Sequence, residues 1–315
     1  MVGTIVIYFT AVQTGVSTSE YMAFNLAYGM ATGAFMSLAG VAGNFASIKP
    51  HLDMAAPIMK SVPESAGGKQ VLEHCSGRIE MDNVTFRYAE GAPAVLDDLS
   101  LKIRPGQSVG VVGKTGCGKS TLMRLLLGFE KPQKGAVLYD GRDIETLDVA
   151  SLRRNIGTVL QDGKLFTGDI FSNIVVAAPW LTMEDAWEAA ELAGIADDIR
   201  AMPMGMNTMV SEGAGGISGG QRQRILIARA VAPKPKVLFF DEATSALDNV
   251  TQRQVSEALD RMKCTRIIVA HRLSTIRACD RIIVLDGGRV VEDGTYEELC
   301  ALGGVFAELV ERQTM

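Results

Sequence analysis

Apolar residues fill the first 48 positions of the chain with almost no charged interruption. Glu20 is the only charged residue between Met1 and Ile48. The uncharged run from Tyr21 to Ile48 would rise roughly 42 Å as a helix, at about 1.5 Å per residue. This rise exceeds the roughly 30 Å hydrocarbon core of a bilayer. The pattern therefore predicts one membrane-spanning helix over about 21–48.

A shorter apolar segment, 2–14, precedes this helix and cannot cross a bilayer alone. Residues 16–20 (VSTSE) supply turn and N-cap chemistry between the two segments, so we expect the end of a truncated helix and then a second helix. The apolar start of the chain lacks the basic residues with which a secretory signal peptide begins. Because Lys49 and Lys60 follow the long helix, the positive-inside rule places the rest of the chain in the cytoplasm.

The pattern changes after position 60. Residues 61–78 (SVPESAGGKQVLEHCSGR) are rich in small and helix-breaking residues and are predicted to form a linker. Short alternating runs then predict strands over 79–88, 95–103 and 108–112. The third strand leads into a glycine-rich loop and then into apolar residues at helical spacing. Residues 79–315 are therefore expected to form a separate domain of mixed strands and helices.

Composition narrows the function classes. The chain has 315 residues, 47% of them hydrophobic and 21% charged, which suits a folded core and excludes disorder. Its net charge of −5 provides no basic field for a nucleic-acid partner. The five cysteines are scattered and include no Cys-x-x-Cys pair, so they indicate neither a disulfide framework nor a zinc site.

The glycine-rich loop after the third strand carries the clearest chemistry. Residues 113–121 (GKTGCGKST) match G-x-x-x-x-G-K-[ST] between a strand and a helix, which is the context that a phosphate-binding loop requires. Glycines let successive backbone N–H groups turn toward an anion, and the helix N-terminus adds its positive dipole end. Lys119 is expected to reach the β- and γ-phosphates of a nucleotide, and Ser120 to place its hydroxyl on Mg²⁺.

Two further segments carry polar groups at element ends. The apolar run 236–240 ends in Asp241 and Glu242, of which one can hold Mg²⁺ and the other can act as a base toward water. Residues 213–224 (GAGGISGGQRQR) form a second glycine-rich helix start with Ser218 as the expected N-cap. That start can bind a second anion or the far side of the same one, and a flexible loop is the alternative interpretation.

The order of these segments resembles the ATP-binding cassette of ABC transporters. The matching motifs are GKTGCGKST, VLQDGKLF with Gln161, ISGGQ, VLFFDE, SALD ending at Asp248, and IIVAHRL with His271. The resemblance implies an α/β fold of the P-loop NTPase class: a RecA-like core, an antiparallel β-subdomain and an α-helical subdomain, preceded by a transmembrane helical segment. It also divides the chain into the end of an exporter membrane domain (1–60), a linker (61–78) and the cassette (79–315).

The resemblance implies a role for each matching residue. Glu242 is the expected general base, and His271, Gln161 and Lys119 complete the catalytic set. Ser120, Gln161 and Asp241 are the expected Mg²⁺ ligands. The residues expected to bind ATP are Tyr88, which would stack on adenine, Gly113, Lys114, Thr115, Gly116, Cys117, Gly118, Lys119, Ser120, Thr121, Ser218, Gly219, Gly220, Gln221 and Asp248.

The family further implies a dimer of two such chains, because Ser218, Gly219 and Gly220 would bind the nucleotide held by the phosphate loop of the partner. We expect a homodimer that works with additional transmembrane helices in lipid, at the bacterial inner membrane, with the cassette in the cytoplasm. Since the chain holds one complete membrane helix and part of another, we expect it to be a C-terminal portion of a half-exporter. A membrane-anchored ATPase that energises a separate permease is the alternative.

The stretches LLLGFEKP, AMPMGMNTMVSEGAGG and DEATSALDNVTQRQV resemble bacterial peptide exporters of the nitrile-hydratase-like leader peptide type. This similarity lies in the ATPase, which does not touch the transported molecule. It implies export of a peptide or bacteriocin, and lipid or drug export is the alternative.

Overall fold

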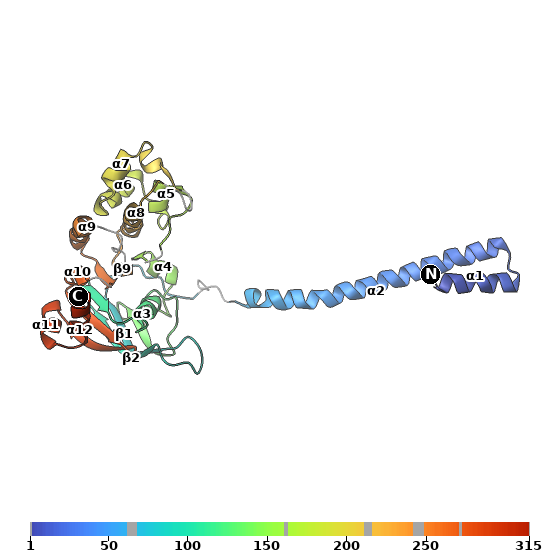
Figure 1. Cartoon of the computed structure of the whole chain (residues 1–315), viewed down its shortest axis with the longest axis horizontal. Helices are drawn as coiled ribbons and strands as arrows, with labels where there is room; N and C mark the ends of the chain where they lie inside the picture. Colours follow the sequence, from blue (N-terminus) through green and yellow to red (C-terminus); the bar gives the residue numbers. More distant parts are fainter. Residues whose placement is uncertain are drawn as a thin grey trace. The chain divides into compact units, whose positions relative to one another are not determined.

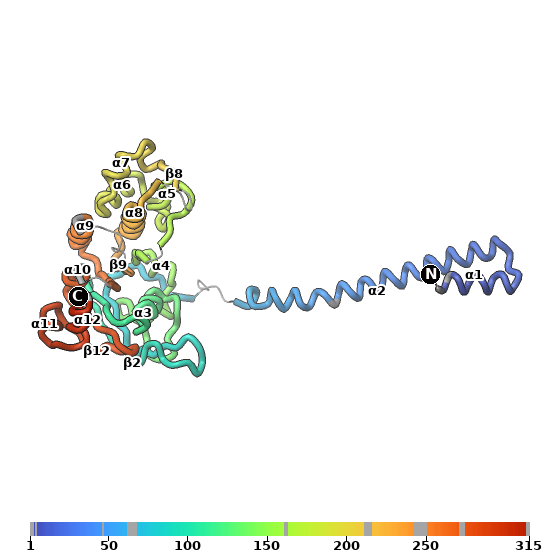
Figure 2. The backbone as a smooth tube through the Cα atoms, in the orientation of Figure 1, coloured from blue at the N-terminus to red at the C-terminus, as the bar shows by residue number. Residues whose placement is uncertain are grey.

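The chain forms two compact units, Met1–Pro63 and Glu64–Met315, in a computed structural model (Figures 1 and 2). Each unit is described by itself. The residues that the structure describes are 2–61, 68–160, 163–210, 216–241, 249–270 and 273–314.

The first unit is a pair of helices, α1 (Val2–Thr14) and α2 (Thr18–Lys60). Ser17 caps α2 as the sequence predicts, since its hydroxyl accepts the Glu20 N–H and its own N–H donates to the Glu20 carboxylate at 3.1 Å. By length and composition, α2 can cross a membrane. It continues past the predicted end at 48 to Lys60, although Pro50 and Pro57 lie inside the helix and each removes a backbone hydrogen-bond donor.

The centre of the second unit is a six-stranded sheet in the order β12-β11-β3-β10-β9-β6. Neighbouring strands run parallel except for the pair β11 and β12. All five residues of β3 are buried, as the central strand of a sheet covered on both faces requires. The strands are β3 (Ser108–Val112), β6 (Ile156–Val159), β9 (Val237–Asp241), β10 (Thr265–Val269), β11 (Arg281–Asp286) and β12 (Arg289–Gly294).

A smaller antiparallel sheet in the order β2-β1-β4-β5 shares its hydrophobic core with helix α3 (Lys119–Leu126). Leu122, Leu125 and Leu126 of that helix are fully buried beside residues of β1 and β2. This packing fixes the helix that follows the glycine-rich loop. The strands are β1 (Ile79–Phe86), β2 (Leu96–Ile103), β4 (Lys134–Tyr139) and β5 (Arg142–Asp143).

Short helices gather around α8 (Gly219–Val231) in a second hydrophobic core, apart from α3 (Figure 1). Helix α6 begins after Thr182, which forms a capping box with Asp185. The helix breaks at Gly194, which has a φ of 66°, and a new helix follows. The remaining elements here are α5 (Ile170–Val175), α6 (Met183–Leu192), α7 (Ala196–Ala201), the 3₁₀ turn η1 (Gly205–Asn207), β7 (Gly168–Asp169) and β8 (Met209–Val210), whereas α4 (Val149–Arg153) packs into the core of α3 through Leu152.

The chain ends in helices that cover the β11 and β12 side of the large sheet. The Glu292 carboxylate accepts the backbone N–H groups of Val305 and Phe306 and so caps the last helix from a neighbouring strand. Phe306 is completely buried. These helices are α10 (Leu273–Ile276), α11 (Tyr296–Leu302) and α12 (Val305–Thr314), whereas α9 (Asn249–Arg261) packs into the core around α8 through Val255 and Leu259.

Part of the segment predicted as a linker bonds to the second unit. The Gln70 N–H donates to the Thr146 carbonyl at 2.9 Å, and the Asp148 N–H donates to the Gln70 carbonyl at 2.8 Å. The Ser76 N–H donates to the Asp140 carboxylate at 2.7 Å. These bonds anchor 70–76 beside β4 and α4, and the predicted division into linker and cassette stays a prediction.

Candidate nucleotide site and its relatives

Strand register brings two predicted site segments to one edge of the large sheet. Val111 of β3 pairs with Val269 of β10, and Val269 pairs with Asp241 of β9. Because these strands are parallel, their carboxyl ends meet at the same edge. The glycine-rich loop that follows β3 therefore lies two strands from Asp241, which ends β9.

The conformation of the loop requires glycine at its first position. Gly113 has a φ of 151°, and a Cβ there would lie 2.2 Å from the Leu285 carbonyl oxygen and 2.7 Å from Cys117 Sγ. Gly118, at the other end of the loop, has a φ of 108° and no room beside Leu96. Both positions therefore exclude a side chain and hold the loop in a tight turn, within which the Cys117 N–H donates to the Lys114 carbonyl at 3.2 Å.

Lys119 is buried at the base of the loop. Its ammonium donates to the carbonyl oxygens of Gly113 at 2.8 Å and Lys114 at 3.0 Å, and it lies 3.8 Å from Cys117 Sγ. Gly118 is the N-cap of α3 and offers no side-chain cap to the first turn of the helix. A confined cation beside uncapped N–H groups has the chemistry of a phosphate site.

The residues of the loop and the nearby Tyr88 differ in their exposure to solvent. Lys114, Thr115, Gly116 and Ser120 are exposed, whereas Cys117 and Thr121 are buried. Tyr88 has a largely exposed ring, and its hydroxyl shares a 3.1 Å hydrogen bond with Thr121 Oγ1 on α3. Its position beside the loop and its exposed aromatic face are compatible with the expected adenine contact.

The second glycine-rich segment starts α8 with a complete capping box. The Ser218 hydroxyl accepts the Gln221 N–H at 3.2 Å, and the Gln221 side-chain oxygen accepts the Ser218 N–H at 2.9 Å. The prediction of Ser218 as N-cap is confirmed. Gly219 and Gly220 form the first turn, whose N–H groups have no partner within a helix.

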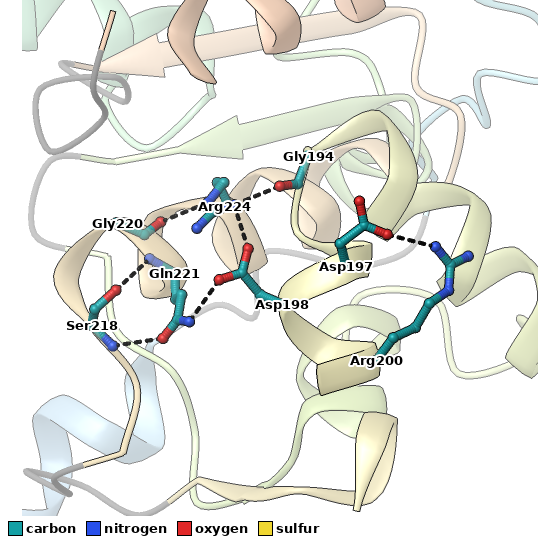
Figure 3. A network of polar contacts seen from close by, with 8 residues as sticks. All are labelled: Gly194, Asp197, Asp198, Arg200, Ser218, Gly220, Gln221 and Arg224. Atoms are coloured by element: carbon teal, nitrogen blue, oxygen red, sulfur yellow. Dashed lines mark hydrogen bonds and ion pairs between the residues drawn. The ribbon is translucent and has the colours of Figure 1, made fainter. Parts of the chain in front are cut away.

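Behind this capping box lies an ionic network that the sequence did not reveal (Figure 3). The Asp198 carboxylate of α7 accepts from the Gln221 amide at 2.8 Å and from Arg224 at 2.7 Å. Arg224 also donates to the Gly194 carbonyl at 2.5 Å. Burial raises the pKa of the Asp198 carboxyl, but the bonds from Gln221 and Arg224 outweigh burial and leave the pKa below its ordinary value.

A second network ties α8 to α5 and to the segment 163–168. Arg229 of α8 donates to the Asn173 carbonyl at 2.8 Å, to Asn173 Oδ1 at 2.7 Å and to the Lys164 carbonyl at 3.1 Å. Its guanidinium also lies 5.0 Å from the centre of the Phe166 ring. Burial lowers the pKa of this guanidinium. Sequence reasoning missed these residues because their partners are up to 65 positions apart.

Four predicted site residues, Gln161, Glu242, Asp248 and His271, lie outside the described residues. Within the described part, the structure groups Tyr88 and Asp241 near the phosphate loop. It places Ser218, Gly219, Gly220 and Gln221 together at a different helix start. Of the expected Mg²⁺ ligands, Ser120 and Asp241 are described, and their hydroxyl and carboxylate oxygens suit that cation.

Comparison with known proteins identifies the class. Residues 96–245 match the family described as ABC transporter. A solved structure of a bacterial Atm1-family ABC exporter with ATP bound superposes with a TM-score of 0.80 at 37% identity, over 85% of this chain and 47% of that chain. The chain therefore contains an ABC transporter ATPase domain, a domain class that binds ATP, and the expected fold class is confirmed.

Two curated relatives match this chain over more residues than the predicted cassette, 79–315, contains. The cyclolysin secretion/processing ATP-binding protein CyaB of Bordetella pertussis is 43% identical over 297 residues, which are 93% of this chain and 41% of CyaB. The alpha-hemolysin translocation ATP-binding protein HlyB of Escherichia coli O157:H7 is 42% identical over 90% of this chain and 40% of HlyB. The chain thus spans about two fifths of the length of these relatives.

Proposed function

We propose that this chain supplies the energy for an ABC exporter of polypeptides by binding and hydrolysing ATP. The observation that carries the ATPase part is the strand register, which brings Asp241 and the phosphate loop with Lys119 to one sheet edge. The similarity to CyaB and HlyB supports the exporter part, since alignments over at least 90% of the chain are longer than its second unit. The proposed organisation is 1–60 in the membrane, 61–78 as linker and 79–315 as cassette.

In this proposal, the loop 113–121 binds the triphosphate and Tyr88 stacks on adenine. Lys119 places a positive charge where negative charge develops on the γ-phosphate. Glu242 takes the proton of the attacking water, and Gln161 and His271 orient the reacting groups. Ser120, Asp241 and Gln161 hold Mg²⁺, which neutralises phosphate charge when it is bound.

The second half of the site comes from a partner copy. Ser218, Gly219, Gly220 and Gln221 lie at the start of α8 in a different core from the phosphate loop. Two chains facing each other would bring each α8 start to the nucleotide on the loop of the other chain, with Asp248 at their interface. We propose a homodimer at the bacterial inner membrane, with the cassettes in the cytoplasm and further transmembrane helices completing the path.

The test of the ATPase is hydrolysis by the purified chain in nanodiscs across protein concentration, with Glu242→Gln as the comparison. We expect a rate that rises more steeply than linearly with concentration and disappears in Glu242→Gln, while ATP-dependent dimers accumulate in that variant. ATP binding without hydrolysis at any concentration would contradict self-assembly. That result would favour the alternative of an ATPase module that acts with a separate permease.

The substrate class rests on the relatives. CyaB and HlyB are named for secretion or translocation of cyclolysin and alpha-hemolysin, so polypeptide export is the class that we propose for this chain. A peptide or bacteriocin is the narrower proposal from the motif resemblance. Lipid or drug export is the alternative, since the Atm1-family exporter, which is 37% identical, is named without a substrate.

A chimera tests this class directly. The matching part of HlyB is replaced by this chain, and alpha-hemolysin translocation is measured with a Lys119→Ala chimera as the control. Translocation that depends on Lys119 would support the proposal. A second chimera that exchanges only 79–315 separates the cassette from the helices. If both chimeras hydrolyse ATP but neither translocates the toxin, polypeptide export loses its support.

A further inference from the structure

Asp198 lies on α7, behind the start of α8, and its two carboxylate oxygens serve two different partners. Oδ1 accepts from Gln221 Nε2 at 2.8 Å, and Oδ2 accepts from Arg224 at 2.7 Å (Figure 3). The partners are 23 and 26 positions away in the sequence. This carboxylate therefore joins a short helix of the helical core to the first turn of the glycine-rich helix start.

We propose that Asp198 is a positioning residue for the ATP site at the start of α8, acting through the side-chain amide of Gln221. This inference deepens the proposed function and rests on it. Asp198 touches neither nucleotide nor water in the reaction. It holds the groups that do.

The amide of Gln221 explains how one carboxylate controls the helix start. Its nitrogen donates to Asp198, so its oxygen must face the Ser218 N–H, which donates to it at 2.9 Å. With that N–H satisfied, the Ser218 hydroxyl accepts the Gln221 N–H and keeps its own proton available for an anion. The unpartnered N–H groups of Gly219 and Gly220 then lie beside the same hydroxyl.

Arg224 compensates the negative charge of Asp198 behind the first turn of α8. A negative charge behind the first turn of a helix would oppose an incoming phosphate unless a cation compensated it. Arg224 provides this cation from the next turn of α8, and its guanidinium is held by the carbonyl oxygens of Gly194 at 2.5 Å and Gly220 at 3.4 Å. The side chain of Arg224 is 15% exposed and that of Asp198 is 30% exposed, so the pair is only partly screened by water.

The neighbouring residue provides a matched control. Asp197 precedes Asp198 on the same helix, carries the same side chain and pairs with Arg200, but 98% of its side chain is exposed. The helix itself is anchored by Ile199 and Ala196, both buried in the core around α8. Removing either carboxylate therefore leaves the apolar anchoring of α7 in place. Only removal of the Asp198 carboxylate takes away the acceptor of the Gln221 side-chain amide.

The experiment compares Asp198→Ala with Asp197→Ala in the full chain in nanodiscs, in the Glu242→Gln background that accumulates ATP-dependent dimers. Binding of a fluorescent ATP analogue to the monomer reports the phosphate loop of each chain. The dissociation constant of the ATP-dependent dimer reports the α8 start. We expect Asp198→Ala to weaken the dimer by about tenfold, in line with a lost charge-assisted bond, and to leave monomer binding unchanged. Asp197→Ala should change neither.

A double-mutant cycle with Gln221→Ala tests the route. If Asp198 acts through the Gln221 amide, Asp198→Ala has little further effect on the dimer once Gln221 is alanine. Full additivity of the two losses overturns the proposed route. Equal dimer affinity for the Asp197 and Asp198 variants, or loss of monomer binding in Asp198→Ala, also overturns the inference. Failure of the background chain itself to dimerise with ATP contradicts the proposed function and the inference with it.

Discussion

The two glycine-rich helix starts of this chain, at α3 and at α8, differ in side-chain capping and in how strictly they require glycine. Both leave first-turn N–H groups for an anion. The start of α3 has no side-chain cap, and glycines at 113 and 118 are required by backbone angles and by contact. The start of α8 has a complete capping box, and a Cβ on Gly219 would meet nothing within 4 Å.

The two helix starts therefore depend on different groups. At α3, the backbone itself has the binding shape, and one buried lysine adds the charge. At α8, side chains from two helices hold the first turn, and Gly219 leaves open space beside it. Open space that the chain does not fill suits the approach of another molecule, as the proposed dimer requires.

The largest expected effect comes from Lys119→Ala. Removing the cation at the base of the loop should lower ATP hydrolysis by about 10³-fold, because in the proposed function Lys119 offsets charge that develops on the γ-phosphate. Steady-state hydrolysis by the purified chain measures this loss. Lys131→Ala, which removes a surface lysine paired with Glu145, is the control and should hydrolyse ATP at the normal rate. Comparable activity in both variants would contradict the role of the α3 start.

The second prediction exchanges a glycine for alanine at each start. Gly113→Ala should lower the free energy of unfolding by about 2–3 kcal/mol, because the methyl group meets the Leu285 carbonyl and φ is 151°. Gly219→Ala lies in helix with free space, so it should raise the free energy of unfolding by up to about 1 kcal/mol. Urea unfolding measures both changes.

The two glycine variants should also differ in ATP binding and in dimer formation. Gly219→Ala should keep ATP binding by the monomer and lose the ATP-dependent dimer, since in the proposed dimer the nucleotide of the partner occupies the space beside Gly219. Gly113→Ala should lose monomer binding. An intact dimer in Gly219→Ala would argue that the α8 start does not contact the nucleotide of a partner.

Both helix starts could be located from the sequence, but the groups that hold the α8 start could not, for a physical reason. The loop before α3 could be located because its signals are local: strand, glycines, Lys119 and helix follow one another directly. The Ser218 cap was equally local. Asp198, Arg224 and the contacts of Arg229 with Asn173 were not predictable, because they join segments that only the folded chain brings together. The two sheets were anticipated as strands, but their order and register depend on long-range pairing.

A smaller effect is expected from removing the cap of α8. Ser218→Ala should lower the free energy of unfolding by about 1 kcal/mol, the usual contribution of an N-cap hydroxyl. Thr182→Ala removes the matching cap of α6, which has the same capping-box geometry, and should cost a similar amount. Thermal unfolding measures both. Only the Ser218 variant should also weaken the ATP-dependent dimer, and equal dimer affinities would show that Ser218 serves only as a cap.

The smallest expected effect is a pH dependence of the network behind α8. Because the bonds from Gln221 and Arg224 outweigh burial, the pKa of the Asp198 carboxyl in the folded chain lies below its ordinary value of 3.8. The ionised carboxylate then contributes stability above pH 3.8, and this contribution is lost as the pH falls through the lower, folded-state pKa. The stability difference between the wild type and Asp198→Ala should be complete near pH 7 and should shrink below pH ~4. Thermal unfolding across this range measures it, with Asp197→Ala as the baseline for general acid effects. A stability difference that grows with acid would mean that Asp198 is protonated in the folded chain, and would contradict its role as a charged acceptor for Gln221 and Arg224.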